Sequence, residues 1–347
     1  MKILITGGLG FIGGNFIINQ LESGKNEIFN IDKETYAANQ DLKKDFEKNS
    51  KYSFLNADIA DQGLKNIILE YDPEVILNFA AETHVDRSID NSSDFLNTNI
   101  LGTVNLLEIA LVISSKNKDF KFIQISTDEV FGDAKDGEFF DEKNNIITSS
   151  PYSASKASAE LFVNAYKRTF GLKCLIANIS NNYGPYQTEE KLIPRSITRL
   201  LNGLKVEIYG DGNNERDWIW VGDACNAINW MLETKTNGDR YCIGNGKSIS
   251  NLEIVSKIIQ IIDRKYGSHI PDWDSSVNAN IEFVQDRPGH DFAYRINSDL
   301  LKNESRWMPG MSIEDGLEKT IDFYFENIDK ANKRKNFMNR IGKVRSK

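Results

Sequence analysis

The chain begins MKILITGGLGFIGG over residues 1–14, and this stretch decides the class of fold. It opens with an apolar run typical of a buried parallel strand, continues into a glycine-rich turn and leads into the helical pattern Phe11–Leu21. In such a unit, Gly7 permits the tight turn, Gly10 lets the backbone approach a pyrophosphate at the helix N-terminus, and Gly13 lets helix and strand pack closely. The stretch therefore predicts a dinucleotide-binding turn.

An acid at the end of the next strand indicates which dinucleotide is bound. Asp32 closes the second apolar run, Glu27–Ile31, about 20 residues after the turn. A carboxylate there accepts hydrogen bonds from the adenosine ribose hydroxyls and repels a 2′-phosphate, so we expect NAD rather than NADP. A glycine-rich turn in another kind of α/β protein is the alternative, and the register of strand, turn, helix and acid argues against it.

Length and composition are those of a soluble globular protein. The 347 residues suggest about two domains, and no apolar run approaches the ~20 residues that span a bilayer. The N-terminus lacks a secretory pattern, so we expect a cytoplasmic protein that does not bind a membrane. Cys174, Cys225 and Cys242 are widely spaced and indicate reduced thiols, and with only three histidines we expect no metal site.

Charge is unevenly distributed along the chain. The net charge is −8, but residues 331–347 hold seven Lys or Arg and no acid, so the remainder carries −15. A strongly acidic body argues against nucleic acid as a ligand. The basic tail is interpreted either as a solvated terminus or as a docking arm.

Alternating apolar runs and helical periodicity through residue 178 predict an α/β fold with a doubly wound, parallel Rossmann-type sheet. Strands are expected at Lys2–Thr6, Glu27–Ile31, Tyr52–Asn56, Val75–Asn78, Phe120–Ile125 and Lys173–Ala177. Helices are expected at Phe11–Leu21, Asp61–Glu70, Phe95–Val112 and Ser153–Phe170. Ligands of such sheets lie beyond the carboxyl ends of the strands. Those ends are Gly7–Gly10, Asp32, Asp58–Ile59, Phe79–Glu82, Ser126–Glu129 and Asn178–Asn181.

After residue 178 the alternation loosens into turn clusters and isolated elements. Helices are expected at Asn251–Lys265 and Ser312–Asn327, and strands at Lys205–Tyr209 and Ile281–Val284. We expect an NAD-binding domain over 1–178, with part of 215–238, and a smaller mixed α/β C-terminal domain over 179–330. The smaller domain would cap the first and hold the substrate, and residues 331–347 would form the tail.

Tyr152 and Lys156 form a Tyr-x-x-x-Lys pattern on a predicted helix, which places both side chains on one face. An ammonium beside a phenol stabilises the phenolate and lowers the pKa of the phenol from about 10 towards neutrality. The result is a base for a sugar hydroxyl. About one such match arises by chance in a chain of this length, so the interpretation depends on position, after the fifth strand and with Ser126 at that strand's end.

Asp128 and Glu129 are adjacent acids that follow Thr127 at the same strand end. Adjacent side chains there point different ways, so one carboxyl can stay protonated as an acid while the other stays ionised as a base. A solvated acidic loop is the alternative, and the neighbouring Tyr/Lys pattern favours catalysis.

Arg216 and Arg287 lie in turn-rich segments. Two guanidinium forks suit a diphosphate, and surface salt bridges are the alternative interpretation.

Together these segments resemble the extended short-chain dehydrogenase/reductases and, within them, the dTDP-glucose 4,6-dehydratase family. The resemblance is carried by GGLGFIG (7–13), TYAAN (35–39), AAETHVDRSI (80–89), STDEVFGD (126–133), PYSASKA (151–157), NNYGPYQ (181–187), KLIP (191–194), GDG…RDW (210–218) and DRPGHD (286–291). The dinucleotide and Tyr/Lys motifs mark only the superfamily. The Thr-Asp-Glu segment separates dehydratases from epimerases, which usually lack the acid pair.

The resemblance implies a three-stage reaction that converts dTDP-glucose into its 4-keto-6-deoxy product and water. Tyr152, kept reactive by Lys156, takes the O4 proton while NAD⁺ takes the C4 hydride, and Thr127 hydrogen-bonds the O4 region. Glu129 then removes the C5 proton, and Asp128 protonates the departing C6 hydroxyl. Hydride returns to C6, which regenerates the cofactor.

The resemblance also assigns the binding residues and a homodimer. NAD would be held by Gly7, Gly10, Phe11, Ile12, Gly13, Asp32, Lys33, Asp58, Ile59, Ala80, Ala81, Thr98, Ser126, Tyr152, Lys156 and Asn178. The nucleotide sugar would be held by His84, Thr127, Asn181, Lys191, Leu192, Tyr209, Arg216, Arg287 and His290. Two protomers would pair through the helices at Phe95–Val112 and Ser153–Phe170.

The chain departs from the family pattern chiefly in its substrate half. Residues 188–190 read Thr-Glu-Glu where Pro is usual, and Ala224, Lys247 and Ala293 stand where His, Asn and Arg are common. Glu207 replaces a Pro before Tyr209, and a carboxylate there can accept an N–H from a base edge.

These departures leave the base open, with thymidine expected first and uridine, cytidine or guanosine as alternatives. A nucleotide-sugar 4-epimerase is the rival activity, and the acid pair disfavours it. A non-enzymatic nucleotide-sensing scaffold is disfavoured by the intact Tyr152 and Lys156.

Overall fold

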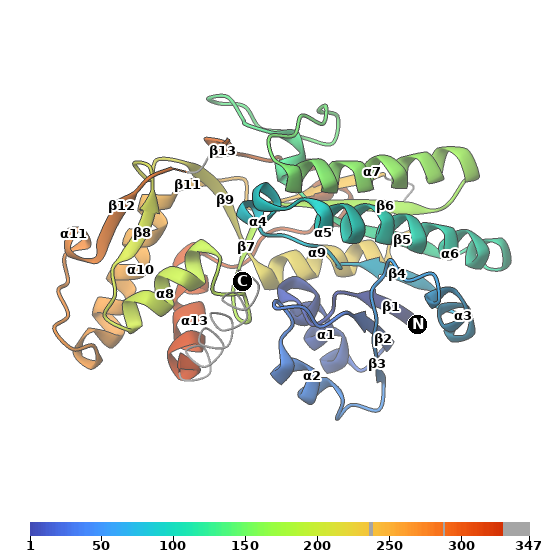
Figure 1. The fold of residues 1–347 in the computed structure, drawn as a ribbon, viewed down its shortest axis with the longest axis horizontal. Coiled ribbons are helices and arrows are strands. Elements are labelled where there is room, and N and C mark those ends of the chain that lie inside the picture. Colours follow the sequence, from blue (N-terminus) through green and yellow to red (C-terminus); the bar gives the residue numbers. More distant parts are fainter. Residues whose placement is uncertain (236–238, 287–288, 329–347) are drawn as a thin grey trace.

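The computed structural model describes residues 1–235, 239–286 and 289–328, and within them the chain folds around a seven-stranded parallel sheet (Figure 1). The strand order is β10 (Arg240–Ile243), β6 (Cys174–Ile179), β5 (Lys121–Thr127), β4 (Val75–Asn78), β1 (Lys2–Thr6), β2 (Glu27–Asp32) and β3 (Tyr52–Asn56). The chain moves outward in one direction from β1 and in the other from β4. The predicted doubly wound Rossmann-type sheet is confirmed, and its switch point lies between β1 and β4.

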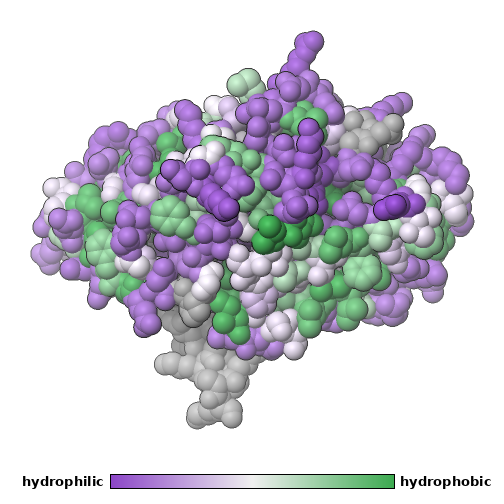
Figure 2. Space-filling model, turned by 90° about the horizontal axis from the view of Figure 1, so that it is seen from above, coloured by the Kyte–Doolittle hydropathy of each residue, from purple (hydrophilic) through white to green (hydrophobic). Residues whose placement is uncertain are grey.

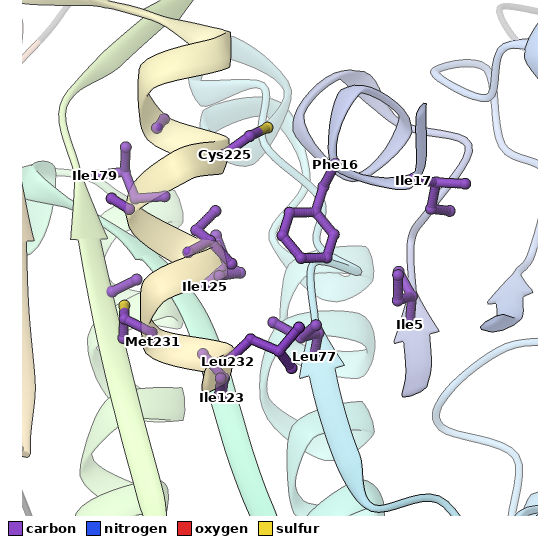
Figure 3. Close-up of a cluster of buried hydrophobic side chains, with 14 of the residues drawn as sticks. Ile5, Phe16, Ile17, Leu77, Ile123, Ile125, Ile179, Cys225, Met231 and Leu232 are labelled. Atoms are coloured by element: carbon purple, nitrogen blue, oxygen red, sulfur yellow. The ribbon is translucent and has the colours of Figure 1, made fainter. Parts of the chain in front are cut away.

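Helices cover both faces of the sheet. One face carries α1 (Phe11–Ser23), α2 (Gln40–Phe46) and α9 (Val221–Glu233), and the other carries α3 (Leu64–Tyr71), α6 (Thr103–Lys116) and α7 (Pro151–Phe170). Figure 3 shows the first of these layers, where Phe16 of α1 and Cys225, Met231 and Leu232 of α9 pack over strand residues such as Ile125.

Buried strands of this kind are apolar on both sides because helices cover both faces. In β1, Ile3 and Ile5 face the α1 and α9 layer while Leu4 faces the α6 and α7 layer, and all three are fully buried. The continuous apolar run at the start of the chain is therefore explained by the two-sided covering.

The helix predicted at Phe95–Val112 is a longer composite. A short α5 (Ser93–Phe95) continues through a π-helical turn, η1 (Leu96–Gly102), into α6. A Cβ on Gly102 would stand 2.5 Å from the Ile59 side chain, so the close approach of this helix to the loop after β3 requires glycine. Among the described residues the stretch Ser93–Lys116 is long and apolar enough to cross a membrane by length and composition, but 56% of its most apolar window is buried inside the protein.

The C-terminal part of the chain builds a second core. Short strands β7 (Asn181–Tyr183), β9 (Glu215–Trp220), β11 (Ser248–Ser250) and β13 (Ala293–Tyr294) form one small sheet, and β8 (Val206–Tyr209) pairs in parallel with β12 (Ile281–Val284). They pack with α8 (Leu192–Leu201), α10 (Asn251–Tyr266) and α13 (Ile313–Glu326), on the left of Figure 1. The remaining short elements are α4 (Val85–Asp90), η2 (Asp128–Phe131), η3 (Gly267–His269), α11 (Val277–Asn280) and α12 (Asp299–Ser305).

The sequence patterns missed α2, α8 and α9, and the strands β9 and β10 together with several shorter elements. The predicted strand ends at Ile125 and Ala177 were also short by two residues, because β5 and β6 run on to Thr127 and Ile179. β10 pairs with β6 although residues 180–239 intervene, and such a long-range pairing leaves no local signal in the sequence.

The close packing of the glycine-rich turn leaves no room for a Cβ at Gly13. A Cβ there would lie 2.6 Å from the backbone oxygen of Gly7, whereas a Cβ on Gly14 would meet only the end of the Leu42 side chain, at the same distance. We expect Gly13→Ala to destabilise the protein by about 1–3 kcal/mol. Gly14→Ala should cost less, because a side-chain end can move and alanine favours the helix.

Thermal unfolding of the two variants measures this difference. Equal midpoints for Gly13→Ala and the wild type would contradict the close approach of turn and helix.

Candidate active site

A cavity of about 460 Å³ lies where the carboxyl ends of the sheet strands face α8 and β8 of the C-terminal part. The sequence-predicted residues that line it are Gly7, Gly10, Phe11, Ile12, Gly13, Asp32, Lys33, Ile59, Ala80, Ala81, His84, Thr98, Ser126, Thr127, Glu129, Tyr152, Lys156, Asn181, Lys191, Leu192, Tyr209, Arg216 and His290. Asp58, Asp128 and Asn178 do not line it, and Arg287 lies outside the described residues.

The turn after β1 is shaped as a cradle. Gly7 has φ +70°, and a Cβ there would stand 2.6 Å from the Ala80 backbone, so the turn and the loop after β4 touch directly. A Cβ on Gly10 would meet only the Gly7 oxygen, at 3.2 Å, so this position is open towards the cavity. These features fit a dinucleotide, because a pyrophosphate needs backbone N–H groups that no side chain covers.

Asp32 is held by the backbone at the end of β2. Its Oδ2 accepts the Leu9 N–H at 3.0 Å and its Oδ1 accepts the Glu34 N–H at 2.9 Å. Burial raises the pKa of Asp32, and the two N–H donors oppose that rise. Each oxygen keeps lone-pair capacity for a ribose hydroxyl.

Lys33 contacts two other predicted cofactor residues, Thr98 and Asp58, and also Glu82. Its Nζ donates to Thr98 Oγ1 at 2.6 Å, lies 3.7 Å from Asp58 Oδ2, and lies 3.3 Å from Glu82 Oε1. Asp58 therefore contacts a residue that lines the cavity without lining the cavity itself.

Helix α7 begins so that Tyr152 and Lys156 reach the cavity. Ser150 caps the helix in a capping box with Ser153, and Pro151 occupies its first turn. The Tyr152 ring packs edge-on against Phe95, with 6.3 Å between ring centroids. Lys156 Nζ donates to the Ile125 carbonyl at 2.6 Å, which fixes it at the end of β5.

The acid–base state of this pair differs from the sequence-based expectation. Burial lowers the pKa of Lys156 to about 8, and burial followed by the negative charge of Glu129 raises the pKa of Tyr152 above its ordinary value. The expected lowering of the Tyr152 pKa is therefore wrong for the protein by itself. A phenolate in so buried a position needs a further positive charge beside it.

Asp128 and Glu129 have different surroundings, as their adjacency predicted. Asp128 is 2% exposed, and its Oδ2 has no hydrogen-bond partner among the described residues. Burial, reinforced by the neighbouring Glu129 charge, raises the pKa of Asp128 well above its usual range, which favours the protonated carboxyl. Glu129 is only half-buried and lines the cavity.

Thr127 organises the short η2 turn that carries both acids. Its hydroxyl accepts the Glu129 N–H at 3.3 Å and donates to Asp128 Oδ1 at 3.2 Å. The end of β5 therefore delivers three polar side chains in three different directions.

Glu160 is a buried polar hub that the sequence patterns missed. It is fully buried on α7, one turn after Lys156, and pairs with Arg240 at the start of β10. Its Oε1 also accepts hydrogen bonds from Ser126 Oγ and, at 2.7 Å, from Asn178 Nδ2. Its spacing of four and eight residues from Lys156 and Tyr152 puts it on the same helix face, a signal that could have identified it.

A second missed cluster joins loops on the two sides of the cavity. The Arg87 guanidinium lies 3.6 Å from the Tyr36 ring centroid, and the Tyr36 hydroxyl donates to Glu190 Oε1 at 3.3 Å. Glu190 Oε2 lies 3.6 Å from Arg87 Nη2 and 3.7 Å from His84 Nε2. Burial lowers the pKa of His84, and Glu190 opposes that effect. Glu190 belongs to the Thr-Glu-Glu segment that departs from the family pattern.

Arg216 and His290 meet at the far side of the cavity. Arg216 Nη2 lies 2.9 Å from His290 Nε2, and its guanidinium lies 4.4 Å from the Tyr294 ring centroid. His290 Nδ1 lies 2.7 Å from Asp286 Oδ1.

Two more charged residues of the cavity lining have partners inside the protein. Lys191 Nζ donates to the Thr83 carbonyl at 2.8 Å. Glu207 is not a lone carboxylate, because it forms ion pairs with Arg195 and Arg199.

Comparison with known proteins identifies the family to which this chain belongs. A sequence model described as GDP-mannose 4,6 dehydratase matches residues 4–320. The dTDP-glucose 4,6-dehydratase of Escherichia coli is 40% identical over 342 residues, with 94% of each chain covered, and that of Haemophilus influenzae is 42% identical over 94% of this chain and 98% of its own. The chain belongs to the dTDP-glucose 4,6-dehydratase family.

Solved structures agree with this membership. The Bacillus anthracis dTDP-glucose 4,6-dehydratase in complex with NAD has a TM-score of 0.82 and 39% identity, covering 94% of this chain and 97% of its own. The Streptomyces venezuelae dTDP-glucose 4,6-dehydratase with NAD and TDP bound has a TM-score of 0.84 and 37% identity, covering 94% and 98%. The UDP-glucose 4-epimerase of Thermotoga maritima has a TM-score of 0.83 at 26% identity over 94% of this chain and all of its own. The fold alone therefore does not distinguish a dehydratase from an epimerase. The cofactor of this chain is NAD.

Asp32 makes a prediction about cofactor choice. A 2′-phosphate placed against this buried carboxylate should cost a few kcal/mol, so NADP⁺ should bind at least tenfold more weakly than NAD⁺. Asp32→Asn should bring the dissociation constants for NADP⁺ and NAD⁺ closer together. Glu34 is a neighbouring carboxylate that does not line the cavity, so Glu34→Gln should leave the ratio of the two constants unchanged. Titration of protein fluorescence with each cofactor measures both dissociation constants. Similar constants in the wild type would contradict the role of Asp32.

Proposed function

We propose that this protein is an NAD-dependent dTDP-glucose 4,6-dehydratase, a hydro-lyase that forms dTDP-4-keto-6-deoxyglucose and water. The observation that carries the proposal is the pairing of a buried Asp128 with a half-buried Glu129 that lines the same cavity as Tyr152 and Lys156. An epimerase needs a single base at O4, whereas elimination across C5 and C6 needs a separate base and a separate acid.

The first stage uses Tyr152 and Lys156. Tyr152 accepts the O4 proton, and Lys156, held on the Ile125 carbonyl, supplies positive charge at the end of β5. NAD, when bound, supplies a hydride acceptor and later a hydride donor. We assign the hydrogen bond to the O4 region to Thr127, which lines the cavity and also bonds Asp128 and the Glu129 backbone.

The second stage uses the two acids in opposite states. Glu129 lines the cavity and removes the C5 proton, which the C4 ketone has made acidic. Asp128 is the proposed acid: burial raises its pKa, which favours its protonated form, and it gives that proton to the departing C6 hydroxyl. Different burial of two adjacent carboxyls therefore separates the base from the acid.

The remaining assignments follow from the same site. We propose that Gly7, Gly10, Phe11, Ile12, Gly13, Asp32, Lys33, Asp58, Ile59, Ala80, Ala81, Thr98, Ser126 and Asn178 hold NAD with Tyr152 and Lys156. We propose that His84, Asn181, Lys191, Leu192, Tyr209, Arg216, Arg287 and His290 hold the nucleotide sugar with Thr127. Residues 1–178 with part of 215–238 would form the cofactor domain, residues 179–330 the substrate domain, and a cytoplasmic location suits a biosynthetic enzyme.

Incubation with dTDP-, UDP-, CDP- and GDP-glucose and catalytic NAD⁺, without added reductant, tests the reaction. The expected product has lost one water, and its yield is highest from dTDP-glucose. A product of unchanged mass, epimerised at C4, would replace the dehydratase with the isomerase.

Substitution of Glu129, the proposed base, should stop elimination of water but not the oxidation at C4 that precedes it. Glu129→Gln should lower product formation at least about 100-fold, because an amide cannot take the C5 proton. It should still permit C4 oxidation, so the absorbance of reduced nicotinamide should rise on adding substrate. Tyr152→Phe should prevent both signals, and Glu138→Gln, an acid on the exposed loop after Gly132, should alter neither. Dehydration by Glu129→Gln at the wild-type rate would remove Glu129 as the base.

We also propose that the protein is a homodimer formed through η1, α6 and α7. Large apolar side chains on these helices face solvent: Leu96, Leu101, Leu161 and Phe162 are 51%, 58%, 58% and 41% exposed. The view from above in Figure 2 shows hydrophobic surface among hydrophilic areas. Exposed leucines on two packed helices are typical of a protein–protein interface.

The double variant Leu101→Glu/Leu161→Glu should therefore halve the mass seen by light scattering at micromolar concentration. Phe283→Glu, on β12 and 53% exposed, is the control and should remain a dimer. A wild-type monomer would exclude this interface.

A further inference from the structure

The shape of the cavity indicates where a nucleotide must lie if the proposed function is correct. The glycine-rich turn and Asp32 line one end, and Tyr152 and Glu129 lie between them and the C-terminal part. The other end is lined by residues of α8 and β8, including Leu192, Arg195, Glu207, Ile208 and Tyr209. A sugar whose C4 lies at Tyr152 therefore extends its nucleotide towards α8 and β8.

Three charged side chains form a fixed cluster at this end. Arg195 and Arg199 stand one turn apart on α8, and both contact Glu207 on β8. Arg195 Nη2 donates to Glu207 Oε2, and Arg199 Nη2 lies 3.2 Å from Oε1. Arg199 is fixed further because its Nε donates to the Lys205 carbonyl. Helix and strand are thus joined through one carboxylate that has an arginine on each oxygen.

This arrangement changes the role expected for Glu207. With an arginine on each oxygen, its carboxylate is committed inside the protein and is a poor acceptor for a base N–H. Arg195 lines the cavity, and only its Nη2 has a partner among the described residues. Its Nε–H and Nη1–H donors are available to a ligand, since a guanidinium carries five N–H groups in a rigid fork. Arg199 does not line the cavity.

We propose that Arg195, positioned by Glu207 and Arg199, is a specificity-determining residue that donates a hydrogen bond to the keto oxygen at C4 of the nucleobase. Thymine and uracil present an acceptor oxygen at C4, and cytosine presents an amino group there. A guanidinium donor faces the oxygen favourably and faces the amino group with donor against donor. The cluster therefore selects keto pyrimidines over cytosine.

Binding of the nucleoside diphosphates dTDP, dUDP and dCDP to the NAD-loaded protein tests this assignment without depending on turnover. The three probes share deoxyribose and diphosphate, so only the base differs. Calorimetry should show dTDP and dUDP binding at least about tenfold more tightly than dCDP, the usual effect of one charge-assisted hydrogen bond. Arg195→Met keeps the apolar stem and should bring the three dissociation constants close together.

Two further variants separate base recognition from general effects of charge. Lys205→Met removes a nearby exposed positive charge and should leave the dTDP-to-dCDP ratio unchanged. Glu207→Gln should lower that ratio partly, because Arg195 keeps its donors but loses its fixed position. With dTDP-glucose as substrate, Arg195→Met should raise KM and leave kcat nearly constant.

The opposite results would overturn the assignment. If Arg195→Met weakens all three diphosphates by one factor, Arg195 binds phosphate and does not read the base. If it changes none of them, Arg195 does not contact the ligand. Failure of the wild type to dehydrate dTDP-glucose, with the binding ratio intact, would overturn the proposed function and leave base recognition by Arg195 standing.

Discussion

Burial of ionisable side chains at the end of β5 is the constraint on which the rest of the site depends. Asp128, Tyr152, Lys156 and Glu160 are all nearly inaccessible to solvent. Burial disfavours the charged form of each, so it raises the pKa of Asp128, lowers the pKa of Lys156 to about 8 and raises the pKa of Tyr152. The same effect that makes these groups costly to bury prepares them for proton transfer.

That cost is offset by a polar network that joins α7 to three neighbouring strands, β5, β6 and β10, at one edge of the sheet. Glu160 on α7 binds Ser126 at the end of β5, Asn178 near the end of β6, and Arg240 at the start of β10. Loss of one member of such a network leaves a buried charge unpaired, which destabilises far more than loss of a surface pair. The catalytic groups are therefore held by strands whose pairing is set far away along the chain. β10, the last of them, joins the sheet only through its contact with β6.

The sequence predicts the Rossmann-type half well because its signals are local. A glycine turn, an acid at the next strand end and apolar runs covered on both sides require only short stretches of chain. The segments proposed to be catalytic could also be located from the sequence, because the end of β5 and the start of α7 each carry their polar residues close together in the chain, and both line the cavity. What the sequence could not predict depends on contacts between distant residues: the pairing of β10, the Arg240–Glu160 ion pair, and the raised pKa of Tyr152. Glu207 shows the same limit, because only the fold brings Arg195 and Arg199 onto its carboxylate.

In the proposed reaction, hydrogen leaves C4 and returns to C6 of the same sugar, and Glu129 and Asp128 remove water from C5 and C6. The position of deuterium after turnover of dTDP-glucose labelled at C4 measures this transfer directly. We expect a product that has lost water and carries the deuterium at C6, as read by NMR and mass spectrometry. Deuterium retained at C4 of a product that still contains its C6 hydroxyl would contradict it and would identify an epimerase.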